Sequence, residues 1–221
     1  MTRFPRLTGL LAAAVLSFVV VDNVRAGEPT EQLRTQVEQV LKILQTKDKA
    51  AARGEIRTVA NKIFDFQETA KRSLGPHWQQ RTPAEREEFT KLFTDLLEQT
   101  YVSKIEQYNG EKVAYTGDEI QGDHAVVHTK IVTAKGTEVP VDYRMLKENA
   151  GWRVYDVAIE GVSLVSNYRS QFNKIIRTSS YGDLVAKMRA KEIGSGSGSG
   201  SPADEPKSPK DSKESKAKRP S

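Results

Sequence analysis

Two neighbouring pairs of aspartate and tyrosine are the first candidates for chemistry in this sequence. Asp142 precedes Tyr143 and Tyr155 precedes Asp156, in stretches whose alternating apolar residues predict β-strands. Aspartate and tyrosine can act as general acid and base when they meet in one pocket. Adjacent residues of a strand point to opposite faces of its sheet, so Asp142 does not share a pocket wall with Tyr143. Enzyme chemistry on such a sheet is therefore only an alternative, and we predict that the protein is not an enzyme.

Asp156 interrupts an otherwise apolar strand face that includes Trp152 and Val154. A carboxylate in such surroundings is either a general base in a dry site or one partner of an ion pair. Arg144 and Arg169 are the candidate partners. We expect the structural ion pair.

The three histidines do not predict a metal site. Asp123, His124 and His128 form the only cluster. Side chains four positions apart on a strand lie about 13 Å from each other, too far to share an ion whose ligands lie at about 2 Å. We interpret His77 as a turn residue, and no serine nucleophile with a histidine partner, phosphate loop or nucleotide fingerprint stands out. The sequence therefore predicts neither a metal nor a cofactor.

Composition excludes further classes. Hydrophobic residues make up 37% and charged residues 29% of the chain, which is typical of a globular domain in water. The absence of cysteine rules out a disulfide scaffold and a thiol nucleophile. Most of the net charge of +5 lies before Gly27 and after Ile193, so the segment between them has no concentrated basic face. We therefore expect no nucleic-acid partner.

The two ends of the sequence differ from the middle. Residues 1–26 combine early arginines, an apolar run and small residues at Val24 and Ala26, which predicts a secretory signal peptide removed after Ala26. A membrane anchor is the weaker alternative, because the apolar run is shorter than the roughly 20 residues needed to span a bilayer. Residues 194–221 are a Gly-Ser linker followed by a charged tail that we expect to be disordered. One domain is expected over residues 27–193.

Amphipathic helices fill the first half of that domain. Apolar stripes at helical spacing predict helices over residues 28–45 and from residue 55 to about residue 73. A third helix begins at Pro83, because Thr82 and Glu85 have the types and spacing of a capping box. Its wide apolar face continues to the Asn-Gly pair at residues 109–110 and needs a large surface opposite.

Alternating stretches predict an antiparallel meander in the second half. The expected strands are residues 112–116, 125–133, 138–146 and 152–159, with hairpin turns between the last three. After the last strand the spacing of the apolar residues changes at Gly161 from that of a strand to that of a helix, and Ser163 is placed to cap this helix. A separate final helix is expected over residues 183–190. Helices together with an antiparallel sheet define the α+β class.

Three segments, in order, carry a resemblance to a known family. GWRVYDVAIEGVSLVSNYRSQF begins at Gly151, FDFQETAKRSLGPHW covers residues 64–78, and LLEQTYVSKIEQY covers residues 96–108. Together they resemble the MlaC family of periplasmic phospholipid carriers, called toluene-tolerance auxiliary components in some species. The resemblance extends from Glu31 to Lys191.

The resemblance implies a curved sheet of about four strands, cystatin-like or NTF2-like, covered by an N-terminal helical layer and C-terminal helices. It also implies a deep apolar cavity for the acyl tails of a phospholipid, with the headgroup left in water. Strand and helix faces then predict the wall residues: Leu97, Tyr101, Val127, Ile131, Val141, Tyr143, Val154, Tyr168 and Phe172.

The resemblance further implies a periplasmic shuttle, which we expect to be a monomer. Its implied partners are an outer-membrane lipoprotein–porin complex and an inner-membrane ABC transporter with an MCE-domain subunit. Relatives linked to hopanoids share the signature, so a polycyclic lipid is an alternative cargo.

Overall fold

The structure, a computed structural model, describes residues 27–46, 49–105 and 107–193. The predicted signal peptide (1–26) and the predicted linker and tail (194–221) lie outside the described residues.

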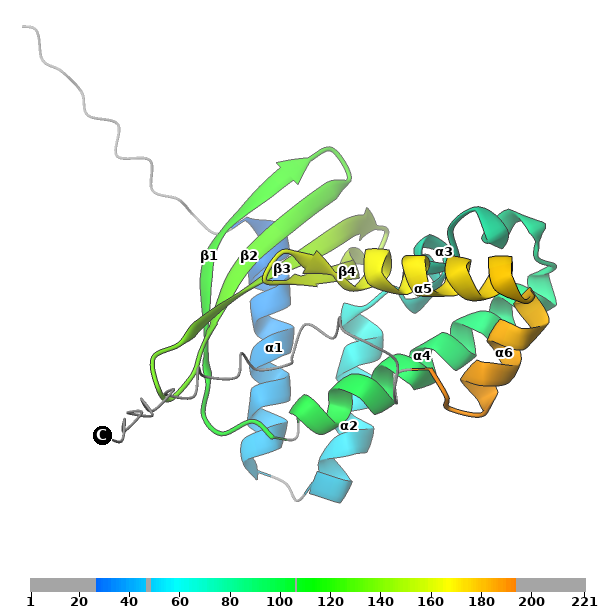
Figure 1. The fold of residues 1–221 in the computed structure, drawn as a ribbon. Coiled ribbons are helices and arrows are strands. Elements are labelled where there is room, and N and C mark those ends of the chain that lie inside the picture. Colours follow the sequence, from blue (N-terminus) through cyan, green and yellow to red (C-terminus); the bar gives the residue numbers. More distant parts are fainter. Residues whose placement is uncertain (1–26, 47–48, 106, 194–221) are drawn as a thin grey trace, which may run out of the picture.

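In the described part of the chain, six α-helices and one short 3₁₀ helix accompany a five-stranded sheet (Figure 1). The helices are α1 (Glu28–Thr46), α2 (Lys49–Ile63), α3 (Phe66–Leu74), α4 (Pro83–Ile105), α5 (Leu164–Thr178) and α6 (Tyr181–Arg189), with the 3₁₀ helix η1 (Gly75–Gln80) after α3. The predicted cap of α4 is present, since the Thr82 backbone N–H donates to Glu85 at 2.8 Å and the Glu85 N–H donates to the Thr82 hydroxyl at 3.3 Å.

The sheet is an antiparallel meander in the order β1-β2-β3-β4-β5. Its strands are β1 (Lys112–Gln121), β2 (His124–Val132), β3 (Glu138–Glu148), β4 (Gly151–Ile159) and the two-residue β5 (Val162–Ser163). Together with the helices, this curved sheet confirms the predicted α+β class (Figure 1). The expected end of the first strand at Thr116 is wrong: a bulge leaves Thr116 without a Cα partner, and pairing resumes at Gly117.

The predicted face of the last strand also needs a correction. Val154 pairs with Met145 and Asp156 pairs with Arg144, which leaves Tyr155 as the extra residue of a β-bulge. Because paired residues share a face of the sheet, Asp156 lies on the face of Arg144 and not on that of Val154. The bulge therefore removes the carboxylate from the apolar face.

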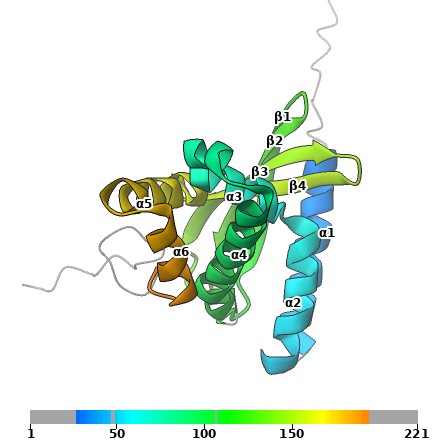
Figure 2. The ribbon, with the colours of Figure 1, turned by 90° about the vertical axis from the view of Figure 1, so that its right-hand side faces the viewer.

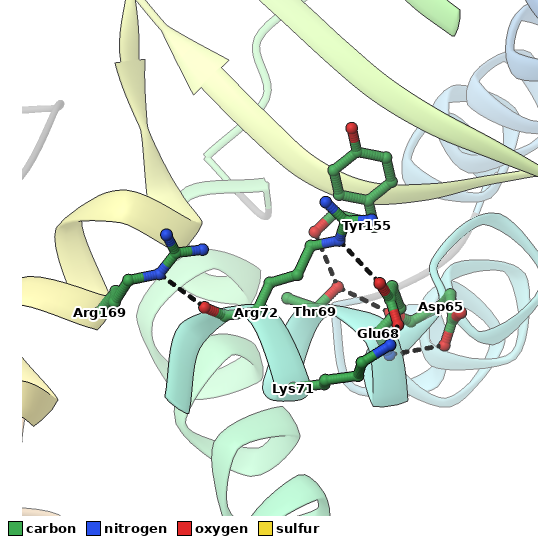
Figure 3. Close-up of polar contacts among 7 residues, drawn as sticks. All are labelled: Asp65, Glu68, Thr69, Lys71, Arg72, Tyr155 and Arg169. Carbon is green, nitrogen blue, oxygen red and sulfur yellow. Dashed lines mark hydrogen bonds and ion pairs between the residues drawn. The ribbon is translucent and has the colours of Figure 1, made fainter. Parts of the chain in front are cut away.

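Contacts from α3 hold this bulge (Figure 3). The Thr69 hydroxyl lies 3.0 Å from the Tyr155 carbonyl oxygen and 2.7 Å from the Asp65 carbonyl oxygen. The guanidinium of Arg72 lies 4.0 Å from the centre of the Tyr155 ring, a cation–π contact. Arg169 of α5 donates through Nε to the Arg72 carbonyl at 2.7 Å, so α5 is tied to α3 at the same junction (Figure 3).

The single helix expected from residue 55 to about residue 73 is wrong. The chain leaves helical geometry at Phe64, which forms an isolated parallel bridge with Val154, and the Asp65 N–H donates to the Val154 carbonyl at 2.9 Å. The Asp65 side chain then caps α3 by accepting from the Glu68 N–H at 3.0 Å. Pairing with the sheet thus interrupts the expected helix at Phe64 and Asp65.

Two separate hydrophobic cores result. The first joins α1 and α2 to the inner face of the sheet and includes Leu33, Met145 and Trp152. The second lies among α3, α4, α5 and α6, where Phe89 and Phe93 meet the ring of Phe172 edge-on at 5.6 and 5.2 Å. Figure 2 shows α1 and α2 on one side, α5 and α6 on the other, and α4 between them.

Candidate functional site

A cavity of about 680 Å³ lies where the two cores meet. That volume falls within the range of sites that hold a small organic ligand. Apolar side chains from α1, α2, α4 and the sheet form most of its wall: Leu33, Val37, Val40, Leu41, Leu44, Ile56, Ala60, Ile63, Phe93, Leu97, Ile105, Val113, Ile131, Val157 and Ile159.

The cavity explains why several inward-facing apolar side chains are only half-buried. Val37, Val40 and Leu44 belong to the apolar stripe of α1, yet each keeps accessible surface. Leu97 of α4 and Ile131 of β2 also line the cavity and keep accessible surface. Their unburied surface faces the cavity, so an apolar guest would complete their burial.

The predicted wall residues fall into two groups. Leu97, Tyr101, Ile131 and Tyr143 line the cavity. The other five lie in the packed cores and do not form part of its wall: Val127, Val141, Val154, Tyr168 and Phe172. For those five the predicted place on the wall needs correction, because alternation shows which residues point inward but not whether a neighbouring element already covers them.

Sequence reasoning missed the contribution of α1 and α2 to the wall. Val40 and Leu44 of α1 and Ile56 and Ile63 of α2 line the cavity, although the sequence indicates only that they lie on the apolar stripes of predicted helices. The only signal for them is the amphipathic period itself, which is the same for a core residue and for a cavity wall.

Four tyrosines line the cavity, Tyr101, Tyr108, Tyr143 and Tyr155, and burial raises the pKa of two of them. Burial raises the pKa of the Tyr143 hydroxyl to about 12. Burial also raises the pKa of Tyr101, and a hydrogen bond between its side chain and that of Tyr168 raises it further. Both phenols stay protonated at neutral pH, so they are suited to hydrogen bonding and not to general-base chemistry.

Asp156 forms the predicted ion pair with Arg144, at 2.6 Å between Oδ2 and Nη1. Asp156 is 5% exposed, and it also accepts from the Ser163 hydroxyl at 2.6 Å and from the Val165 N–H at 3.0 Å. Ser163 in turn caps α5, as predicted, by accepting from the Ser166 N–H. The carboxylate therefore fixes the start of α5 and has the contacts of a structural group.

The other acid–base candidates lie apart from one another. Asp142 lies 2.8 Å from Nδ1 of His128, on the sheet face opposite Tyr143. His77 lies in η1 with Nε2 3.1 Å from the Asn173 amide oxygen. Among the described residues, no three histidine, aspartate or glutamate side chains are grouped so as to hold a metal ion.

The outer edge of the cavity is charged. Arg57 of α2 reaches across to α4, where its Nε lies 2.9 Å from Glu98 and its Nη2 lies 3.5 Å from Asp95. Arg57 and Glu98 both line the cavity.

Among the described residues, no helix has both the length and the hydrophobicity that a membrane span requires.

A mostly apolar cavity between helices and a curved sheet is typical of a protein that binds a hydrophobic ligand. The family model for the MlaC protein matches residues 34–190, and the chain belongs to this family. The resemblance seen in the sequence is thus confirmed.

Known proteins that are similar to the chain include the following two. The intermembrane phospholipid transport system binding protein MlaC of Haemophilus influenzae is 26% identical over 121 residues, which cover 52% of this chain and 56% of that protein. The chain thus matches little more than half the length of that relative. The phospholipid-binding protein from Ralstonia solanacearum, whose structure contains a phospholipid, is 26% identical with a TM-score of 0.67, covering 75% of this chain and 97% of the other.

Proposed function

We propose that the protein carries phospholipid, with the acyl tails in the cavity and the headgroup at its charged edge. The cavity of about 680 Å³ with its apolar wall is the observation that supports this proposal most directly. The Ralstonia solanacearum protein shares the fold and contains a phospholipid in its structure. The Haemophilus influenzae relative is named for intermembrane phospholipid transport.

A carrier is needed because free phospholipid does not cross water at a useful rate. A diacyl lipid exposes roughly 28 methylenes on leaving a membrane, and at about 0.8 kcal/mol each the cost is on the order of 20 kcal/mol. The cavity replaces membrane hydrocarbon by protein hydrocarbon, so loading is close to neutral. Net direction then comes from the proteins on which the carrier docks.

The proposed compartment is the periplasm. This assignment is supported by the signal-peptide pattern of residues 1–26 and by membership of the MlaC family. The proposed docking partners are an outer-membrane lipoprotein–porin complex and an inner-membrane ABC transporter with an MCE-domain subunit. The protein performs no chemistry on its cargo and acts as a monomer.

Lipid analysis tests the proposal. Protein purified after export should contain diacyl phospholipid at close to one molecule per chain, measured by mass spectrometry of a solvent extract. Leu97→Trp and Ile131→Trp place large rings in the cavity and should reduce bound lipid at least fivefold with native circular dichroism. Ile120→Trp is the matched control, because Ile120 is 52% exposed and lies outside the cavity wall.

These measurements test the binding site, the cargo and the carrier function separately. Retention of lipid by both cavity variants would contradict the proposed site. A polycyclic lipid in place of diacyl phospholipid would contradict the proposed cargo and keep the cavity. A protein that remains free of lipid after incubation with vesicles would contradict the carrier function itself.

A further inference from the structure

Several polar side chains on the cavity wall already have partners within the protein. The Thr69 hydroxyl lies within hydrogen-bond distance of two backbone carbonyl oxygens, at 2.7 and 3.0 Å. Arg57 and Glu98 pair with each other at 2.9 Å, and Asp156 pairs with Arg144 at 2.6 Å. These groups are satisfied without a guest.

The hydroxyl of Tyr143 is different. Tyr143 lies on the inner face of β3, where its register partners are Val127 of β2 and Val157 of β4, and it lines the cavity. Burial alone raises its pKa to about 12, with no hydrogen bond from a described residue contributing. A phenol enclosed by apolar side chains is unfavourable without an acceptor, so Tyr143 is suited to a guest that supplies one.

The nearby phenols do not supply that acceptor. Tyr115 of β1 is packed against the same core as Tyr143, and its pKa is raised by burial and further by Tyr143. Within the part of the chain that the structure describes, the buried Tyr115 hydroxyl has no hydrogen-bond partner, so it does not bond to Tyr143. Tyr101 of α4 lines the cavity, but its side chain is hydrogen-bonded to Tyr168.

The two remaining tyrosines of the wall lie in other surroundings. Tyr108 follows the exposed Gln107 in the segment between α4 and β1. The ring of Tyr155 contacts the Arg72 guanidinium at the bulge. Tyr143 is therefore the tyrosine placed between aliphatic side chains of two neighbouring strands.

We infer that Tyr143 makes the cavity specific for acyl esters, because its hydroxyl donates a hydrogen bond to an ester carbonyl of the bound phospholipid. This inference rests on the proposed carrier function. With the headgroup at the charged edge and the tails in the cavity, the glycerol esters lie just inside the apolar wall. There each carbonyl oxygen is a buried acceptor that needs a donor. The phenol and the carbonyl thus satisfy each other.

A phospholipid with alkyl ether chains lacks these carbonyls. Its ether oxygens are weaker acceptors and are flanked by methylenes, so the Tyr143 hydroxyl keeps no full partner in that complex. A site that hydrogen-bonds its ligand discriminates against an analogue that leaves the polar group unpaired. For one neutral hydrogen bond in an apolar site, the expected preference is about fivefold to tenfold.

Competition between an ester lipid and an ether lipid tests the inference. Lipid-free protein is incubated with vesicles that contain equal amounts of dioleoyl phosphatidylcholine and its dioleyl ether analogue, and bound lipid is quantified by mass spectrometry. The natural sequence should bind the ester in about fivefold excess. Tyr143→Phe should bring the ratio to about one with native circular dichroism, because it removes only the hydroxyl.

Infrared spectroscopy gives a second readout that does not depend on affinity. A hydrogen bond weakens the C=O bond of its acceptor. The ester carbonyl stretch of isotope-labelled dioleoyl phosphatidylcholine should therefore lie at lower frequency when it is bound to the natural sequence than when it is bound to Tyr143→Phe. Equal frequencies in the two proteins would overturn the assigned hydrogen bond.

Tyr115→Phe is the matched control. It removes a phenol hydroxyl from the same sheet, but Tyr115 lies outside the cavity wall, so the ratio of bound lipids should stay as in the natural sequence. Equal uptake of the two lipids by the natural sequence, or an ester preference that persists in Tyr143→Phe, would overturn the inference. A failure to take up either lipid would instead contradict the carrier function.

Discussion

Asp156 shows how a single residue joins two elements of this fold. Its carboxylate accepts from Arg144 on β3, from the Ser163 hydroxyl and from the Val165 N–H at the start of α5. Bonds to a nearly buried carboxylate are charge-assisted, and losing them leaves the donors without partners. The orientation of α5 relative to the sheet therefore depends on this one side chain.

Asp156→Ala should lower the free energy of unfolding by about 2–4 kcal/mol, because it removes three hydrogen bonds and leaves the Arg144 charge without its partner. Urea denaturation followed by circular dichroism measures the change. Asp142→Ala is the control, since the Asp142 side chain is 36% exposed and its loss should cost less than about 1 kcal/mol. Equal effects of the two substitutions would contradict a structural role specific to Asp156.

At the scale of elements, one additional residue decides which side chains face the cavity. The bulge at Tyr155 keeps Trp152 and Val154 on the inner face and then returns Val157 and Ile159 to that same face. Without the bulge, strict alternation would turn Val157 and Ile159 away and would place Asp156 inside. The part of the apolar wall that β4 contributes exists because of this irregularity.

Deletion of Tyr155 should restore regular pairing of β4 with β3 and keep Asp156 opposite Arg144, because Tyr155 is the residue without a Cα partner. It should still lower the free energy of unfolding by about 1–2 kcal/mol, because it removes the carbonyl that accepts from Thr69 and the ring that contacts Arg72. Soluble yield and the cooperativity of thermal unfolding are the measurements. Deletion of Lys135, in the exposed turn between β2 and β3, is the matched control and should be tolerated. A protein lacking Tyr155 that is as stable as the natural sequence would contradict this role of the contacts between α3 and the bulge.

At the scale of the whole molecule, the cavity lies between two cores that each pack well. α1, α2 and the sheet form one core, and α3 to α6 form the other. Several side chains that line the cavity, such as Leu97 and Ile131, are incompletely buried. A guest with alkyl tails would complete this burial and would contact both cores at once.

Removal of lipid should consequently lower the stability of the protein. A ligand present at 100 times its Kd stabilises the native state by about 2.7 kcal/mol, which corresponds to a fall in Tm of roughly 5–10 °C on delipidation of a domain of this size. Differential scanning calorimetry before and after solvent extraction measures this change, and adding back phospholipid should restore the Tm. Leu97→Trp, with its cavity occupied, should show little difference between the two states. An unchanged Tm in the natural sequence would contradict a coupling between cargo and fold.

The sequence by itself determined the class of fold, the family and most of the elements. The capping box of α4, the cap of α5 and the antiparallel meander follow from residue types at fixed spacing, because the interactions that create them are local or repeat with the period of a helix or strand.

Tertiary structure alone decided where the chain breaks those periods and which inward-facing residues remain uncovered. The bulge at Tyr155 and the break between α2 and α3 depend on pairing between segments far apart in the sequence. Val127 and Ile131 follow the same alternation on β2, yet the first is packed in a core and the second lines the cavity. Whether such a side chain is covered depends on elements distant in the chain, and no pattern within one strand contains that information.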